Sequence, residues 1–171
     1  MTAAHSHSAP HPIEAKERKE LARIRSEPKF KQAYAKYRKE NSEFHIPYLA
    51  GSDKQGTTVY FDPRTPQAAR KTIAIHEKTE GVLIRLYGFD YAKAHKYATQ
   101  AEREVVGDRW RTYQAALEEP IRQAEKAPKR NMPPDLLQAS YADPDRFTER
   151  KGSSRDARAE RNGMTCDGNR T

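Results

Sequence analysis

The chain has 171 residues but only one cysteine, Cys166, which excludes an internal disulfide and any zinc site built from cysteines. It also has no long apolar run, since no segment approaches the roughly 18 residues that span a bilayer. The N-terminus has no charged segment leading into an apolar one, as a secretory signal would. These absences predict a soluble protein without a membrane partner, located in the cytoplasm or, if phage-related, associated with a virion.

Hydrophobic residues are scarce as well. They make up 35% of the chain, against 33% for charged residues, so the core should be small and part of the chain should lie outside it. Residues 1–12 and 139–171 are predicted to be disordered because they are rich in Ser, Pro, Gly and mixed charges. Charged helices are predicted within 13–43, followed by a core at 44–138.

The formal net charge of +8 favours contact with an acidic partner, such as nucleic acid or a larger assembly. A helix predicted over Lys29–Asn41 places Phe30, Tyr34 and Tyr37 on one face among lysines. Aromatic side chains in this setting can stack on bases. Such a stripe more often packs on its own domain, and we favour that interpretation.

A β-hairpin is predicted next. Phe44–Ala50 alternates like a strand, Gly51–Gly56 is rich in turn residues, and Thr57–Phe61 is β-branched and aromatic. Thr65 and Pro66 suit the N-cap and first position of the helix that follows. We therefore expect a mainly α fold of the α+β class, with one small β-hairpin.

The following helix carries the sequence His76-Glu77-x-x-Glu80. His76 and Glu80 would lie one turn apart on the same helical face, where both can bind one metal ion. Glu77 would point roughly 100° further round the helix, which suits a general base better than a ligand. This is the geometry of a His-Glu-x-x-His zinc helix with the second histidine replaced by glutamate.

A second helix would supply the third ligand. Gly88 interrupts the apolar run and Asp90 is a suitable N-cap, so the two helices should form a hairpin. His95 would then complete two His and one Glu, a standard set for catalytic zinc. Glu102 falls on the same face as His95 and is an alternative ligand, a carboxylate that orients a histidine, or a surface acid.

A plainer interpretation of these residues needs no metal. His76 and His95 would be partly buried helix residues with ordinary hydrogen bonds, and Glu77 and Glu80 would be solvated. His45 lies in the predicted first strand, where it could face the metal or lie at the strand edge, and it is left out of the site. The three remaining histidines lie in the N-terminal tail, where they could bind metal adventitiously: His5, His7 and His11.

After Gly107, a further amphipathic helix is predicted because four large apolar side chains share one face: Trp110, Tyr113, Leu117 and Ile121. Trp110 is expected to anchor the core. Pro120 is expected to kink or divide this helix. A short docked turn is predicted at Met132–Leu137.

At the His76-Glu77-x-x-Glu80 helix and His95, the chain resembles the zincin metallopeptidases. The ligand order resembles a variant of the gluzincin arrangement, in which a His-Glu-x-x-His helix precedes a helix bearing a glutamate. The resemblance implies zinc as the cofactor and a peptide or protein as the substrate, with Glu77 moving the proton of a metal-activated water. It also implies that the exposed strand of the predicted β-hairpin, beside the metal helix, holds the peptide; the alternative, which we favour slightly, is that the β-hairpin only covers one side of the helical hairpin.

A second resemblance covers roughly residues 44 to 138. The segments Ile46–Ser52 and Val59–Asp62, together with both helix motifs, resemble small uncharacterised proteins of bacterial and phage genomes. This resemblance implies no established activity. It leaves open a non-enzymatic structural or interaction protein, phage-related or contacting nucleic acid, in which the His/Glu cluster braces the helical hairpin.

Overall fold

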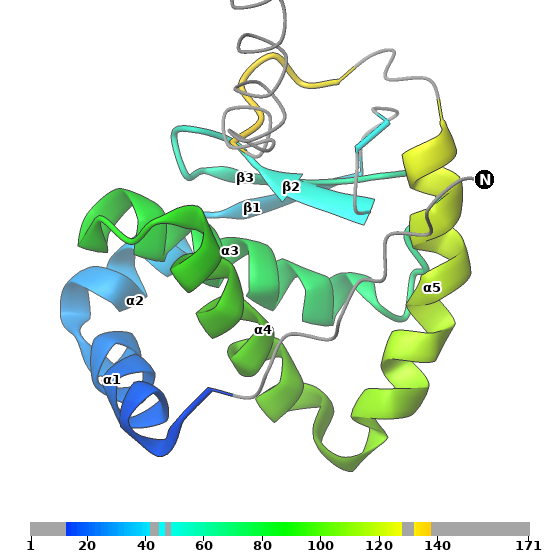
Figure 1. Ribbon diagram of the computed structural model, residues 1–171. Coiled ribbons are helices and arrows are strands. Elements are labelled where there is room, and N and C mark those ends of the chain that lie inside the picture. Colours follow the sequence, from blue (N-terminus) through cyan, green and yellow to red (C-terminus); the bar gives the residue numbers. More distant parts are fainter. Residues whose placement is uncertain (1–12, 42–44, 47–48, 128–131, 138–171) are drawn as a thin grey trace, which may run out of the picture. The chain divides into compact units, whose positions relative to one another are not determined.

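The structure is a computed structural model that describes residues 13–41, 45–46, 49–127 and 132–137. The segments predicted to be disordered, 1–12 and 139–171, lie outside the described residues. The helices and strands in chain order are α1 (Ala15–Ser26), α2 (Pro28–Ala35), β1 (Arg38–Asn41), β2 (Ala50–Ser52), β3 (Thr58–Phe61), α3 (Arg70–Tyr87), α4 (Tyr91–Val106), the 3-10 turn η2 (Gly107–Arg109) and α5 (Trp110–Lys126) (Figure 1). The prediction of a mainly α fold with a small β-hairpin is confirmed.

The N-terminal helices α1 and α2 share the core of the later elements. Leu21 and Ile24 of α1 and Phe30 of α2 are buried in the same hydrophobic cluster as Leu83 and Tyr97. Pro28 starts α2, because its fixed φ and missing N–H suit the first turn of a helix. The charged surface of these helices therefore covers side chains that belong to the central core.

The helix predicted over Lys29–Asn41 is wrong in its second half. The helix ends at Ala35, and Arg38–Asn41 forms β1, which pairs in parallel with β3. Residues Arg38–Asn41 form a strand rather than a helix because they pair with β3, and helix propensity is a weak preference that tertiary contacts override. Phe30 and Tyr37 are buried, so the aromatic stripe packs on the domain, as the favoured interpretation held.

The predicted β-hairpin exists, but its turn lies further along the chain. The sheet has the order β1-β3-β2, and β2 and β3 are antiparallel. β2 begins at Ala50, where the predicted first strand was to end. The shift follows from Asp53, whose side chain accepts hydrogen bonds from the backbone N–H groups of Thr57 at 2.7 Å and Thr58 at 3.1 Å. This closes the turn after Asp53.

The segment Met132–Leu137 docks along the outer edge of β2, in agreement with the predicted docked turn. The Leu137 N–H donates to the Ser52 carbonyl at 2.7 Å, and the Lys54 N–H donates to the Asp135 carbonyl at 2.8 Å. Part of the strand edge that the zincin resemblance assigns to a peptide is thus occupied by the chain itself.

The predicted helical hairpin is confirmed as α3 and α4, which pack side by side. Gly88 ends α3 in the left-handed conformation at φ 65°, which a glycine adopts without steric cost. The Asp90 side chain accepts from the Lys93 N–H at 2.8 Å and caps α4, as predicted. The predicted start of α3 is wrong: the helix begins at Arg70, and Thr65 instead donates its hydroxyl to the Leu49 carbonyl.

Helix α5 folds back after Gly107, whose φ of 62° ends α4. α5 is not divided at Pro120, which excludes one of the two predicted outcomes; proline removes one bond of the helical ladder, and the bonds on both sides still hold the helix. Trp110 does not anchor the core, because it is only half-buried and lies against Tyr113. The remaining three predicted side chains do pack on the core: Tyr113, Leu117 and Ile121.

Among the described residues, none of the helices has both the length and the apolar character needed to cross a membrane.

Candidate metal centre

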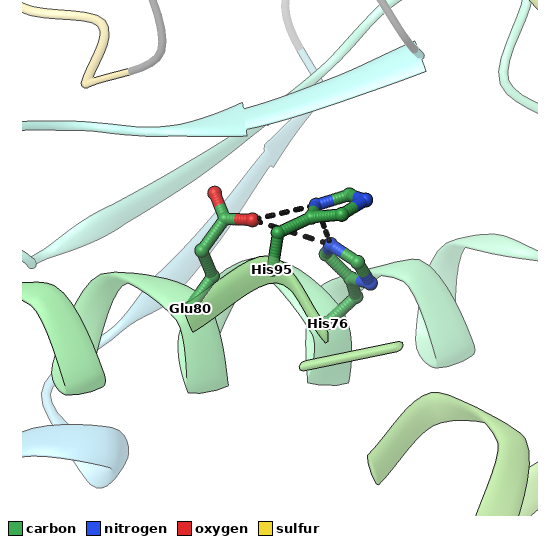
Figure 2. A group of neighbouring side chains, drawn as sticks. All are labelled: His76, Glu80 and His95. Carbon is green, nitrogen blue, oxygen red and sulfur yellow. Dashed lines mark hydrogen bonds and ion pairs between the residues drawn. The ribbon is translucent and has the colours of Figure 1, made fainter. Parts of the chain in front are cut away.

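His76, Glu80 and His95 meet between α3 and α4 (Figure 2). The His76 Nε2 atom lies 3.1 Å from His95 Nδ1 and 3.4 Å from the nearer Glu80 oxygen, Oε2. His95 Nδ1 lies 2.9 Å from the same Glu80 oxygen. The helical spacing of four residues brings the first pair together, and the α3–α4 hairpin brings His95 to them.

These three atoms have the chemistry and spacing of metal ligands. Donors placed about 2.0–2.2 Å from a tetrahedral zinc ion lie roughly 3.3–3.5 Å from one another. The observed separations of 2.9, 3.1 and 3.4 Å need to open by only a few tenths of an ångström. Three lone pairs facing one another also repel unless a proton or a cation lies between them, so the cluster favours a positive charge at its centre.

Glu80 provides a buried negative charge for such a cation. Its side chain is 1% exposed, and its second oxygen, Oε1, has no hydrogen-bond partner within the described part of the chain. Burial acts to raise the pKa of Glu80, but hydrogen bonds from His76 and His95 outweigh it and lower the pKa to about 2. Glu80 is therefore ionised at neutral pH and can bind a metal ion without first losing a proton.

The pKa of His76 is also changed by the Glu80 carboxylate. Burial acts to lower its pKa, but hydrogen bonds to Glu102 and Glu80 outweigh the burial and raise the pKa well above 6.5. Without a metal, His76 thus carries the positive charge that the cluster favours. A metal ion would replace this proton, because a histidine ligand must be neutral.

Glu102 lies behind His76 and is not one of the converging donors. Its Oε2 is 3.1 Å from His76 Nδ1, the ring nitrogen that faces away from Glu80. Its Oε1 accepts a hydrogen bond from the Tyr113 hydroxyl at 2.6 Å. Of the three roles predicted for Glu102, this position matches the carboxylate that orients a histidine ligand.

His95 is the most exposed member of the cluster. The His95 side chain is 43% exposed, whereas that of His76 is 11% exposed. The His95 ring stacks on Tyr91, with 5.6 Å between ring centroids. Three protein donors leave one position of a four-coordinate ion available, which is the arrangement of catalytic zinc sites.

Glu77, the predicted base, is buried and lies outside the three-donor group. Burial is the main cause of the raised pKa of Tyr37, and the charge of Glu77 adds to it. Gly81, one helical turn after Glu77, lies against the Tyr37 hydroxyl, so Glu77 is on the face of α3 directed toward Tyr37, next to the ligand face. Its role as a base stays a prediction.

The other histidines lie elsewhere. His45 Nδ1 is 3.1 Å from the Arg64 guanidinium, which also binds Asp62. His5, His7 and His11 lie outside the described residues. The contact that sequence reasoning missed is Tyr113 with Glu102; the only signal was that Tyr113 lies on the apolar face of its helix, which does not identify a partner.

Comparisons of the chain with protein families, curated proteins and solved structures found no match. The resemblance to zincins therefore stays a prediction that rests on the residues of the motif.

Proposed function

We propose that His76, Glu80 and His95 bind zinc and that the protein is a zinc-dependent hydrolase acting on peptides. The observation that carries this proposal is the convergence of two imidazole nitrogens and one carboxylate oxygen at 2.9–3.4 Å. Two His and one Glu suit zinc, which takes nitrogen and oxygen ligands in tetrahedral geometry.

Bound zinc would supply a Lewis acid and lower the pKa of a water molecule toward about 7. Glu77, which follows the first ligand directly, would accept the proton of that water and pass it to the leaving amine. Glu102 holds the His76 ring from behind. These three roles are the parts of a metal-assisted hydrolysis.

The zincin resemblance would place a peptide substrate along the outer edge of β2. β2 packs against α3, the helix that carries two of the ligands. The Ser52 carbonyl points away from β3 and is paired with Leu137. Ala50, two residues earlier, points its backbone to the same outer edge but is only 1% exposed, so the peptide is proposed from the motif and not from a free strand edge.

A structural metal is the second candidate. Glu80 is 1% exposed and binds His95 across the two helices of the hairpin, so an ion here would also clamp α3 to α4. In that case zinc would stabilise the fold without any reaction.

The substitution Glu77→Gln tests the hydrolase. Removing a general base costs about 10²–10⁴-fold in rate, so this variant should retain zinc and lose turnover of a mixed peptide library. Glu119→Gln is the control, because Glu119 is an exposed side chain on α5 paired with Arg122. Unchanged turnover in Glu77→Gln would exclude the proposed mechanism; zinc binding without turnover in the wild type would favour the structural metal.

A further inference from the structure

Tyr113 joins α5 to the rear of the candidate metal centre. Gly107 ends α4 and the 3-10 turn reverses the chain, so the first turn of α5 lies against the end of α4. Tyr113 therefore meets Glu102, eleven residues earlier, with its hydroxyl 2.6 Å from Oε1. The proposed ligands lie on α3 and α4, and this contact extends their environment to a third helix.

The directions of these hydrogen bonds fix the orientation of His76. The Tyr113 hydroxyl donates to Oε1 of Glu102. The other oxygen, Oε2, then accepts from His76 Nδ1 at 3.1 Å. A neutral histidine with its proton on Nδ1 has its lone pair on Nε2, which is the atom that faces Glu80 and His95.

Loss of the Tyr113 hydroxyl would leave Oε1 of Glu102 without this partner. Glu102 is 8% exposed, so water could replace the lost bond only in part, and the carboxylate could rotate away from His76. An unsatisfied buried acceptor costs about 1–3 kcal/mol. The ring of His76 would then lose part of the restraint that aims Nε2 at the centre.

We propose that Tyr113 is a positioning residue of the metal centre, acting through Glu102 on His76, and that it couples metal binding to the docking of α5. The proposal rests on the proposed metal site. Leu117 and Ala124 of α5 are buried, and Tyr113 and Ile121 are partly buried against the core; the Tyr113 bond adds a direct polar contact between α5 and α4 to this packing. By thermodynamic linkage, a bond that tightens zinc binding is itself tightened by zinc to the same extent.

The test compares two tyrosines that make the same bond in different places. The Tyr97 hydroxyl donates to Glu20 on α1 at 2.6 Å, which matches the bond of Tyr113 to Glu102. Zinc affinity is measured by chelator competition on the full chain with alanine at His5, His7 and His11. Tyr113→Phe should weaken zinc binding by roughly tenfold and change the visible spectrum of the Co²⁺ form, whereas Tyr97→Phe should change neither.

The outcomes separate this inference from the metal site itself. Equal zinc affinity in the wild type and Tyr113→Phe would overturn the role of Tyr113 and leave the metal site standing. No zinc uptake by the wild type would overturn the site, and the inference with it. Hydrogen exchange adds the reciprocal readout: zinc should slow exchange in α5 of the wild type and of Tyr97→Phe, and have little effect in Tyr113→Phe.

A measurement on the wild type keeps the inference testable if Tyr113→Phe does not fold. Nitrogen-15 NMR of the zinc-loaded protein should show His76 protonated at Nδ1 and bound to zinc through Nε2. A His76 ring protonated at Nε2, or bound through Nδ1, would overturn the proposal.

Discussion

The Tyr37 side chain lies close to α3 at Gly81, the residue that follows the proposed ligand Glu80. A Cβ atom added at this position would lie 2.2 Å from the Tyr37 hydroxyl oxygen and 3.1 Å from Ser52 Oγ. Replacing glycine by alanine inside a helix normally stabilises it by up to about 1 kcal/mol. Here we expect Gly81→Ala to lower the free energy of unfolding by about 1–3 kcal/mol, because the side chains must move apart. Urea denaturation measures this change.

The double variant Gly81→Ala with Tyr37→Phe is the matched control for this prediction. The closest atom is the hydroxyl oxygen, while the ring carbon that carries it, Cζ, lies 3.3 Å from the added Cβ. Removing the hydroxyl should therefore restore most of the lost stability. A double variant as unstable as Gly81→Ala alone would show that the clash with Tyr37 is not the cause.

At the residue scale, part of the candidate site could be predicted from local spacing. His76 and Glu80 are four residues apart on one helix, and a single capped reversal separates them from His95, so their convergence follows from helical geometry. The partner of Glu102 could not be predicted in this way. Tyr113 reaches it only because α5 crosses α4 at a particular angle, which depends on side-chain packing rather than on spacing.

At the scale of elements, α4 presents His95 and depends on its N-cap. The Asp90 side chain accepts the Lys93 N–H at 2.8 Å, so Asp90→Ala should lower the free energy of unfolding by about 1 kcal/mol. Asp90→Ser retains a capping oxygen and should recover most of this loss. Chemical denaturation of the three proteins checks the prediction, and equal losses in the alanine and serine variants would contradict it.

The elements that sequence predicted correctly are those with strong local signals. The α3–α4 hairpin has an apolar periodicity, a C-terminal glycine and an aspartate cap. β1 has no such signal: Arg38–Asn41 is polar and continues a helical pattern, and it becomes a strand because β3 lies beside it. The start of α3 was misplaced for a similar reason, since Thr65 binds the distant Leu49 carbonyl and does not cap the helix.

At the scale of the whole molecule, the metal-free cluster makes stability depend on pH. The folded-state pKa of Glu80 is lowered from 4.5 to about 2, so its contribution is present above about pH 4.5 and is lost as the pH falls toward 2. The pKa of His76 is raised above 6.5, so its contribution is present below pH 6.5 and is lost as the pH rises through the raised value.

Because the contributions of Glu80 and His76 depend on pH in opposite directions, the cluster should stabilise the fold most within a limited pH range. With a chelator present, the stability difference between the wild type and Glu80→Gln should be largest between about pH 4.5 and 6.5 and should shrink on both sides. Denaturation across this range measures the difference. With zinc added, the stability difference between the wild type and Glu80→Gln should instead increase above about pH 6.5. The reason is that metal binding requires the deprotonated histidine and so strengthens with pH. A difference that does not vary with pH would contradict the buried ion pair.

The N-terminal helices must be kept in any such measurement. Ile13, Leu21 and Ile24 belong to the hydrophobic cluster that also holds Val82 and Leu83 of α3. α1 also binds α4 directly, since Lys96 donates to Glu17 and Tyr97 donates to Glu20. Truncation to the motif-bearing segment would expose this core, so the full chain is the appropriate protein.

The metal content of the full chain, measured by mass spectrometry, tests the central claim most directly. Alanine at His5, His7 and His11 removes adventitious binding by the tail. His76→Ala and His95→Ala each remove one proposed ligand, and His45→Ala is the control, because His45 binds Arg64 and not the cluster. Near-stoichiometric zinc in the parent and in His45→Ala, lost in both ligand variants, is the predicted result. Zinc at background level in the folded parent would contradict the account.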